Sequence, residues 1–145
     1  MPEIRHQVQI AATPKTIYPL ISSAEGFGRW WAADVRRAGT AGTVVELGFF
    51  GRGTVFRLRP QTFLAPNQTS WQCESGEEWA GTSITFVTGP HATGSVLRLT
   101  HGGWAAESDL FIAANTTWGA LLHRLRAVAE GRELGPLFTV DTLAD

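Results

Sequence analysis

The segment GSVLRLTHGGW, residues 94–104, places a histidine where the local pattern calls for an apolar side chain. Apolar and polar residues alternate along it, and His101 follows Leu97 and Leu99 on the apolar face of a predicted strand. A histidine in such a place is most often hydrogen-bonded to a neighbouring carbonyl, but it can also orient a ligand or transfer a proton. His101 is therefore the first candidate site residue.

A second histidine, His6, lies on the apolar face of the segment EIRHQVQIA, residues 3–11. If the two histidines were neighbours, they could shuttle a proton, sense pH or contribute to a metal site. A metal site needs a third ligand, and only Glu107 or Asp109 is near His101 in sequence. No His-x-His or His-x₃-His spacing occurs, so we predict no bound metal.

Asn115 is a polar residue on the apolar stripe of a predicted helix, four residues after Phe111 and three before Trp118. One interpretation is that Asn115 marks a helix start or kink within ANTTW, because Asn and Thr are good capping residues. The other is that its amide points into a cavity and orients a ligand, as the few polar groups of apolar pockets do.

Six tryptophans in a chain of this size indicate an aromatic-lined interior or cavity, because an indole N–H needs a partner when it is buried. Each tryptophan can equally be core packing. Trp118 and Trp104 are the best candidates to line a pocket, since Trp118 is on the helix and Trp104 follows His101. Trp30 and Trp31 are adjacent, so only one of them is expected to face inward if they are helical.

The motifs of known catalytic and phosphate sites are missing from the sequence. It contains no G-x-S-x-G, no H-E-x-x-H and no phosphate-binding loop, and GFFGRGT, residues 48–54, indicates a hairpin turn. The single cysteine, Cys73, is interpreted as a small core residue. Acid–base chemistry by His101 with Asn115 stays open as an alternative.

Period-2 patterns predict a strand at the N-terminus and five more between residues 43 and 101, separated by turns rich in Gly, Pro and Asn. Between them, Thr13 with Pro14 and then Ser23 predict the starts of two short helices. Apolar residues at helical spacing predict a long amphipathic helix after Ser108, ending near Gly131. The remaining tail, residues 131–145, is expected to wrap over the surface or extend as an arm.

Composition restricts the class of protein. The 145 residues suit one domain, and the formal net charge of −1 does not favour a nucleic-acid partner. No run of about 18 apolar residues and no apolar leader occurs, so neither membrane insertion nor secretion is expected. A single cysteine suits a reducing compartment, and we expect a cytoplasmic protein without a cofactor.

The order of strand, two short helices, five or six strands and long C-terminal helix resembles the START-like, or SRPBCC, superfamily. The residues Thr13-Pro14 and Trp30-Trp31, the segments GTSITF and GSVLRLTHGGW, and Trp118 followed by LLHRLRAVAEGRELGP resemble the branch homologous to the activator of the heat-shock-protein ATPase. The resemblance implies a helix-grip fold, in which a curved antiparallel sheet grips the last helix around a cavity for an apolar ligand. It also implies that the first strand lies beside the last, which would bring His6 near His101.

Together these observations predict an α+β protein with one domain over residues 1–145 and a sheet of about six or seven strands. The predicted function is binding of a small apolar, aromatic or lipid-like ligand between the sheet and the C-terminal helix. A cyclase- or hydrolase-type enzyme and a co-chaperone-like interaction module are the alternatives, and a homodimer is possible. The predicted ligand-binding residues are His101, Asn115, Trp118, Trp104, Trp31, Phe111, Trp71, Phe86 and Leu99.

Overall fold

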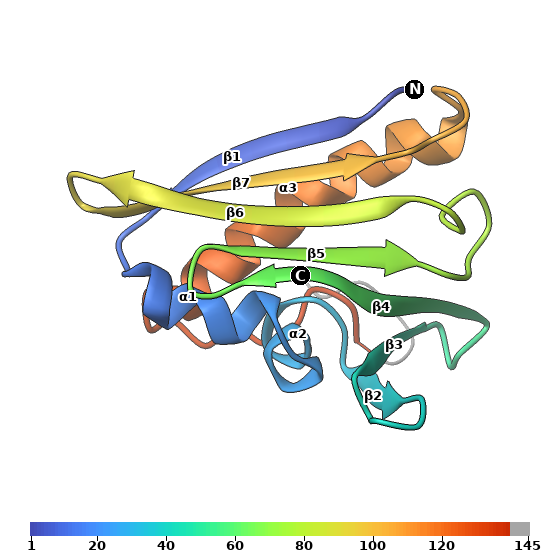
Figure 1. The fold of residues 1–145 in the computed structure, drawn as a ribbon, viewed down its shortest axis with the longest axis horizontal. Helices are drawn as coiled ribbons and strands as arrows, with labels where there is room; N and C mark the ends of the chain where they lie inside the picture. Colours follow the sequence, from blue (N-terminus) through green and yellow to red (C-terminus); the bar gives the residue numbers. More distant parts are fainter. Residues whose placement is uncertain (140–145) are drawn as a thin grey trace.

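A computed structural model describes residues 1–139. The element order is β1 (Ile4–Ile10), α1 (Pro14–Ile21), α2 (Ala24–Trp30), β2 (Asp34–Ala38), β3 (Val44–Phe49), β4 (Thr54–Leu64), β5 (Gln68–Cys73), β6 (Ser83–His91), β7 (Gly94–Gly102) and α3 (Asp109–Ala129). The antiparallel sheet has seven strands in the order β1-β7-β6-β5-β4-β3-β2. Figure 1 shows the curved sheet with α3 running across one face and α1 and α2 at one end of that face. The predicted α+β class is confirmed.

The alternation in the sequence determines which face of the sheet is buried. Register pairs such as Phe86 with Leu99 and Leu47 with Phe56 align the apolar positions of neighbouring strands under α3. The opposite face carries the charged positions, where Arg57 donates to Glu46 and contacts Glu74, so ion pairs link neighbouring strands. The strand β2 was not recognised in the sequence, because DVRRA has no period-2 pattern and forms a short edge strand.

The two short helices meet at a junction in which side chains satisfy the last carbonyls of α1. The α1 helix begins at Pro14 with Thr13 as its N-cap, as predicted, and is only eight residues long with Pro19 inside it. The last four carbonyl groups of a helix have no partner within the helix. Here two hydroxyls bond to the first two of these carbonyls, Ser22 to Tyr18 O and Ser23 to Pro19 O. Two indole N–H groups bond to the others, Trp30 to Leu20 O and Trp71 to Ile21 O.

The long helix α3 is capped at both ends, at its C-terminal end by Gly131 as predicted. Ser108 is the N-cap, and its hydroxyl accepts from the backbone N–H of Phe111. At the other end, Gly131 has a φ of 89°, its N–H donates to Val128 O, and Arg132 N–H donates to Ala127 O. This pair of bonds is a Schellman motif, which needs the left-handed conformation that glycine adopts without strain.

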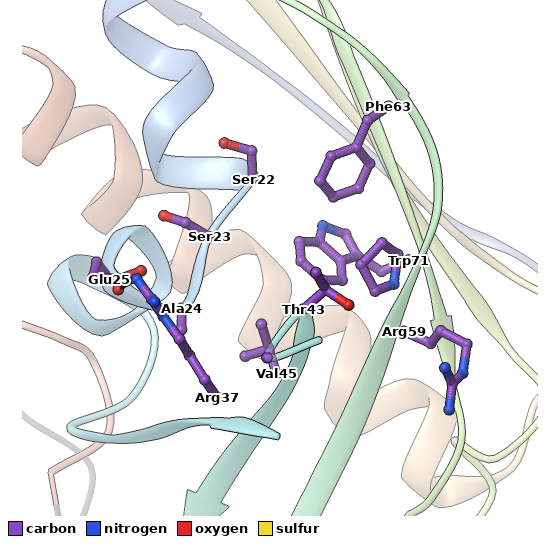
Figure 2. Close-up of a pocket in the computed structure, with 12 residues that line it drawn as sticks. Ser22, Ser23, Ala24, Glu25, Arg37, Thr43, Val45, Arg59, Phe63 and Trp71 are labelled. Carbon is purple, nitrogen blue, oxygen red and sulfur yellow. Dashed lines mark hydrogen bonds and ion pairs between the residues drawn. The ribbon is translucent and has the colours of Figure 1, made fainter. Parts of the chain in front are cut away.

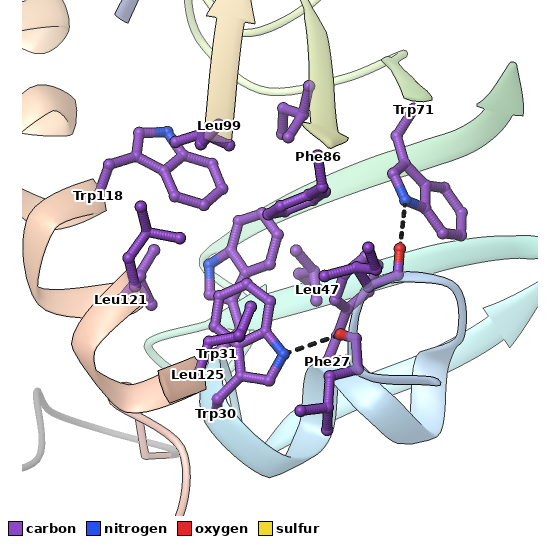
Figure 3. Packing of buried hydrophobic residues seen from close by; sticks show 14 of the residues in the cluster. Phe27, Trp30, Trp31, Leu47, Trp71, Phe86, Leu99, Trp118, Leu121 and Leu125 are labelled. Atoms are coloured by element: carbon purple, nitrogen blue, oxygen red, sulfur yellow. Dashed lines mark hydrogen bonds between the residues drawn. The ribbon is translucent and has the colours of Figure 1, made fainter. Parts of the chain in front are cut away.

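Aromatic side chains fill the middle of the space between the sheet and α3 (Figure 3). Trp30 and Trp31 are both fully buried and stack at 5.3 Å, so the expectation that only one of them faces inward is wrong. Trp31 is the C-cap of α2 and keeps a helical backbone, with its N–H bonded to Phe27 O. Both rings are buried because Trp30 packs against Phe86 of the sheet and Trp31 against Trp118 of α3. Phe27 packs against both rings and against Trp71.

The described part of the C-terminal tail packs against the end of α2. The backbone N–H groups of Leu137 and Phe138 donate to the carbonyls of Trp30 and Trp31, and Ala33 N–H donates to Phe138 O. Leu137 is buried there. The tail predicted as a wrap or arm continues through residues 140–145, which lie outside the described residues.

Candidate functional site

His101 lies in the core, with both ring nitrogens hydrogen-bonded. Its Nδ1 is 3.0 Å from Trp118 Nε1, and its Nε2 is 2.8 Å from Thr82 Oγ1. An indole N–H can only donate, so Nδ1 accepts and Nε2 carries the proton. The Thr82 hydroxyl then donates to Trp79 O at 2.6 Å, which completes a chain of directed hydrogen bonds.

The surroundings of His101 keep it neutral. Burial lowers its pKa from 6.5 to about 3, because a charged imidazolium would be stripped of water. Its ring also contacts three tryptophans, with ring centroids 4.5 Å from Trp79, 4.9 Å from Trp104 and 6.0 Å from Trp118. A fully buried, neutral imidazole with both nitrogens occupied is suited to positioning these rings and poorly suited to acid–base catalysis.

His6 and Asn115 bind each other rather than His101. His6 Nε2 lies 2.8 Å from Asn115 Oδ1 and 3.1 Å from Asn115 O, and since both are acceptors Nε2 is the donor. The first strand does pair with the last, with Ile4 opposite His101 and His6 opposite Leu99. Asn115 is exposed on a continuous α3, so it marks neither a helix start nor a kink. Its amide ties the helix to β1.

The remaining titratable side chains form no metal centre in the part of the chain that the structure describes. There, no three His, Cys, Asp or Glu side chains lie close enough together to hold a metal ion. Cys73 is buried, and burial raises the pKa of its thiol to about 12, so it is not a thiolate nucleophile.

An apolar pocket of about 240 Å³ opens between α3, the β3–β4 end of the sheet and the tail. One wall is the face of α3 that carries Leu110, Ala114, Trp118 and Leu121, spaced three or four residues apart. Among residues 1–139, no charged side chain lines it. The lining residues in that range are Trp31, Phe49, Phe50, Thr54, Phe56, Trp79, Leu110, Ala113, Ala114, Thr117, Trp118, Leu121 and Phe138.

The structure brings only part of the predicted site residues to this pocket. Trp31 and Trp118 line it, and the tryptophan ring centroids are 4.9 Å apart. His101 lies behind Trp118 and holds its N–H, so Trp118 contributes its ring to the wall. Elsewhere in the buried core lie Trp104, Phe111, Phe86 and Leu99, while Trp71 lines a different pocket and Asn115 is exposed.

Most of the aromatic residues at the pocket mouth were missed by sequence reasoning. Phe49 and Phe56 were assigned to the apolar face, but their position at the open end of the sheet was not recognised. Phe138 comes from the tail, and no periodicity could have placed it there. The signal that could have found the helical wall is the run of small and apolar residues at 110, 113, 114, 117, 118 and 121.

A second pocket, of about 460 Å³, lies between the α1–α2 junction, the β2–β3 turn and β4 (Figure 2). Trp71 and Phe63 form its aromatic side, and their ring centroids are 5.0 Å apart. Its charged residues are already paired, Arg37 with Glu25 and Arg59 with Glu74. The hydroxyls of Ser22 and Ser23 donate to α1 carbonyls, so these polar groups maintain the junction.

None of the helices within residues 1–139 combines the length and the apolar composition needed to cross a bilayer. Comparison with protein families finds no matching family model. No curated protein matches the sequence.

Solved structures do match over nearly the whole chain. An Aha1 dimer from Colwellia psychrerythraea is 27% identical, with a TM-score of 0.79 over 92% of this chain and 99% of that chain. An AHSA1-like protein from Rhizobium etli is 22% identical, with a TM-score of 0.68 over 93% of this chain and 86% of that one. A protein from Mesorhizobium loti is 16% identical, with a TM-score of 0.72 over 88% of this chain and 96% of that one. The chain therefore has the helix-grip fold and is similar to the Aha1 and AHSA1-like proteins of known structure.

Proposed function

We propose that this protein binds a small, uncharged, apolar ligand in the pocket between α3 and the β3–β4 end of the sheet. The observation that carries the proposal is the lining, which is almost entirely aromatic and aliphatic and, within the described part of the chain, includes no charged side chain. Binding is favoured at an open apolar surface of this kind, because a ligand that covers it displaces water from both apolar surfaces.

The volume of the pocket limits the size of the ligand. An engineered protein cavity of about 150 Å³ binds benzene, whereas pockets for drug-sized molecules begin at about 300 Å³. The pocket measures about 240 Å³, so it suits a molecule of one or two rings or a short aliphatic chain. Aromatic rings on several walls favour a ligand that is itself aromatic.

The enzyme alternative has less support from the geometry. His101 would be its acid or base, but the side chain is buried behind Trp118 and neither nitrogen is free to meet a substrate. Asn115, its proposed partner, is hydrogen-bonded to His6 instead of His101. We therefore favour ligand binding over catalysis.

Native mass spectrometry of the purified protein, before and after denaturation, would reveal a ligand that co-purifies. Binding is then measured directly with 6-propionyl-2-dimethylaminonaphthalene, a neutral two-ring probe whose fluorescence rises and shifts to the blue when it leaves water. The unaltered chain should bind the probe. Ala113→Phe places a ring in the pocket wall and should abolish binding.

The matched control is Ala120→Phe, which adds the same ring to an exposed position of the same helix that does not line the pocket. It should bind the probe as the unaltered chain does. No binding by the unaltered chain, or equal binding by the Ala113 and Ala120 variants, would refute the proposal.

We also propose that the chain forms a homodimer. The support is its similarity, at 27% identity and a TM-score of 0.79, to a chain whose solution structure is that of a dimer. Sedimentation equilibrium at several concentrations tests this. A mass that stays at 15.7 kDa across the range would contradict it.

A further inference from the structure

The hairpin between β3 and β4 contains one more left-handed residue than its turn requires. Gly53 N–H donates to Phe50 O, which closes a turn with Gly51 and Arg52 at the centre. Gly51 has a φ of 64° and Arg52 a φ of 67°, and positive φ at both central positions is what a type I′ hairpin turn needs. Phe50 precedes this pair, yet it also has a φ of 53°.

A left-handed backbone is unfavourable for a bulky residue, so something must compensate for it. At Arg52 the compensation is visible, because its guanidinium donates to Asp34 Oδ1 at 2.8 Å and to Glu46 Oε1 at 2.7 Å. At Phe50 burial does not provide it, since the residue is 58% exposed. Within residues 1–139, the ring of Phe50 meets one other aromatic ring, that of Phe138 at 6.4 Å.

The left-handed conformation places the Phe50 ring beside the apolar pocket. Phe50 and Phe138 both line the apolar pocket, and Phe138 packs edge-on against Phe49 at 5.1 Å. The exposed Phe50 ring is therefore part of the wall at the pocket mouth, where a bound molecule would cover it. Its burial would occur only in the complex, so in the free chain the unfavourable backbone lowers stability while it holds the ring where a ligand can cover it.

We propose that Phe50 is a ligand-contact residue that covers an uncharged aromatic ligand at the mouth of the pocket. The inference rests on the proposed function, and it gives Phe50 the role of raising the affinity of the pocket for aromatic ligands. Its aromatic neighbours Phe49, Phe56 and Phe138 make the mouth a ring-lined opening, to which a flat aromatic molecule is complementary.

Phe50→Asn tests the inference, because asparagine tolerates a left-handed backbone but has no ring. We expect it to bind 6-propionyl-2-dimethylaminonaphthalene about tenfold more weakly, from the apolar area lost. Its urea unfolding midpoint should be equal to or higher than that of the unaltered chain. Phe50→Tyr keeps the ring and should bind within about twofold of the unaltered chain.

The matched control is Leu64→Asn, at a residue that is also 58% exposed but lies outside the pocket, and it should leave binding unchanged. Binding by Phe50→Asn equal to that of the unaltered chain overturns the inference while the proposed function stands. Weaker binding together with a lower unfolding midpoint also overturns it, since Phe50 would then be structural. An unaltered chain that does not bind the probe overturns both.

Discussion

Mild acid should destabilise this protein through His101. Burial lowers the pKa of this imidazole from 6.5 to about 3. Between these pH values the imidazole is protonated in the unfolded chain and neutral in the folded chain. Because the folded pKa lies below the unfolded one, stability is complete above pH 6.5 and decreases as the pH falls towards 3. The slope is about 1.4 kcal/mol per pH unit, which gives a loss of about 2 kcal/mol between pH 8 and pH 5.

The comparison that isolates this effect is with His101→Phe, which keeps a ring of similar shape but cannot titrate. At pH 8 the variant should be less stable by about 1 to 3 kcal/mol, because Trp118 Nε1 loses its acceptor inside the core. Between pH 8 and pH 5 it should lose about 2 kcal/mol less than the unaltered chain. The two stabilities therefore converge as the pH falls.

Urea unfolding followed by tryptophan fluorescence at pH 8, 6.5 and 5 measures both quantities. The other three histidines are present in both proteins, so their contributions cancel in the difference. Equal losses of stability in the two proteins would refute the reasoning, because His101 would then titrate in the same way in the folded and unfolded chains.

Three further predictions concern the framework around the site. Burial raises the pKa of the Cys73 thiol to about 12, so dithionitrobenzoate at pH 8 should react slowly with the folded chain and quickly with the urea-unfolded chain; equal rates would show an accessible thiol. Gly131→Ala should lower the free energy of unfolding by about 1 kcal/mol in a urea titration, because alanine is strained at a positive φ. Ser108→Ala should cost about 1 kcal/mol by the same measurement through loss of the α3 N-cap, whereas Ser108→Asn keeps a capping oxygen and should restore most of it.

The parts of the fold that the sequence predicts are those with local causes. Thr13 and Ser23 were recognised as N-caps from their side chains and from the pattern that follows them, and the structure confirms both. Gly131 was expected to end α3, because a left-handed position after a helix favours glycine. The apolar face of the sheet followed from period-2 alternation, which depends only on backbone geometry.

What the sequence could not predict depends on contacts between distant segments. The edge strand β2 exists because β3 offers it a partner, and its own residues show no alternation. Phe138 reaches the pocket only because the tail binds back to Trp31. Asn115 lies about 60° around the helix axis from Trp118, at the margin of the stripe, where the position of β1 decides that it meets His6.

The polar residues that seemed suited to hold a ligand are used instead to hold the walls of the pocket. His101 fixes Trp118 through its Nδ1, and Asn115 fixes α3 to β1 through His6, and neither residue lines the pocket. Recognition of the proposed ligand would then rest mainly on shape and apolar area, with each buried methylene contributing about 0.8 kcal/mol, or roughly a factor of four in affinity. A pocket of this kind distinguishes ligands by size more sharply than by functional group, which is why loss of the Phe50 ring should affect binding more than any change of polarity at the mouth.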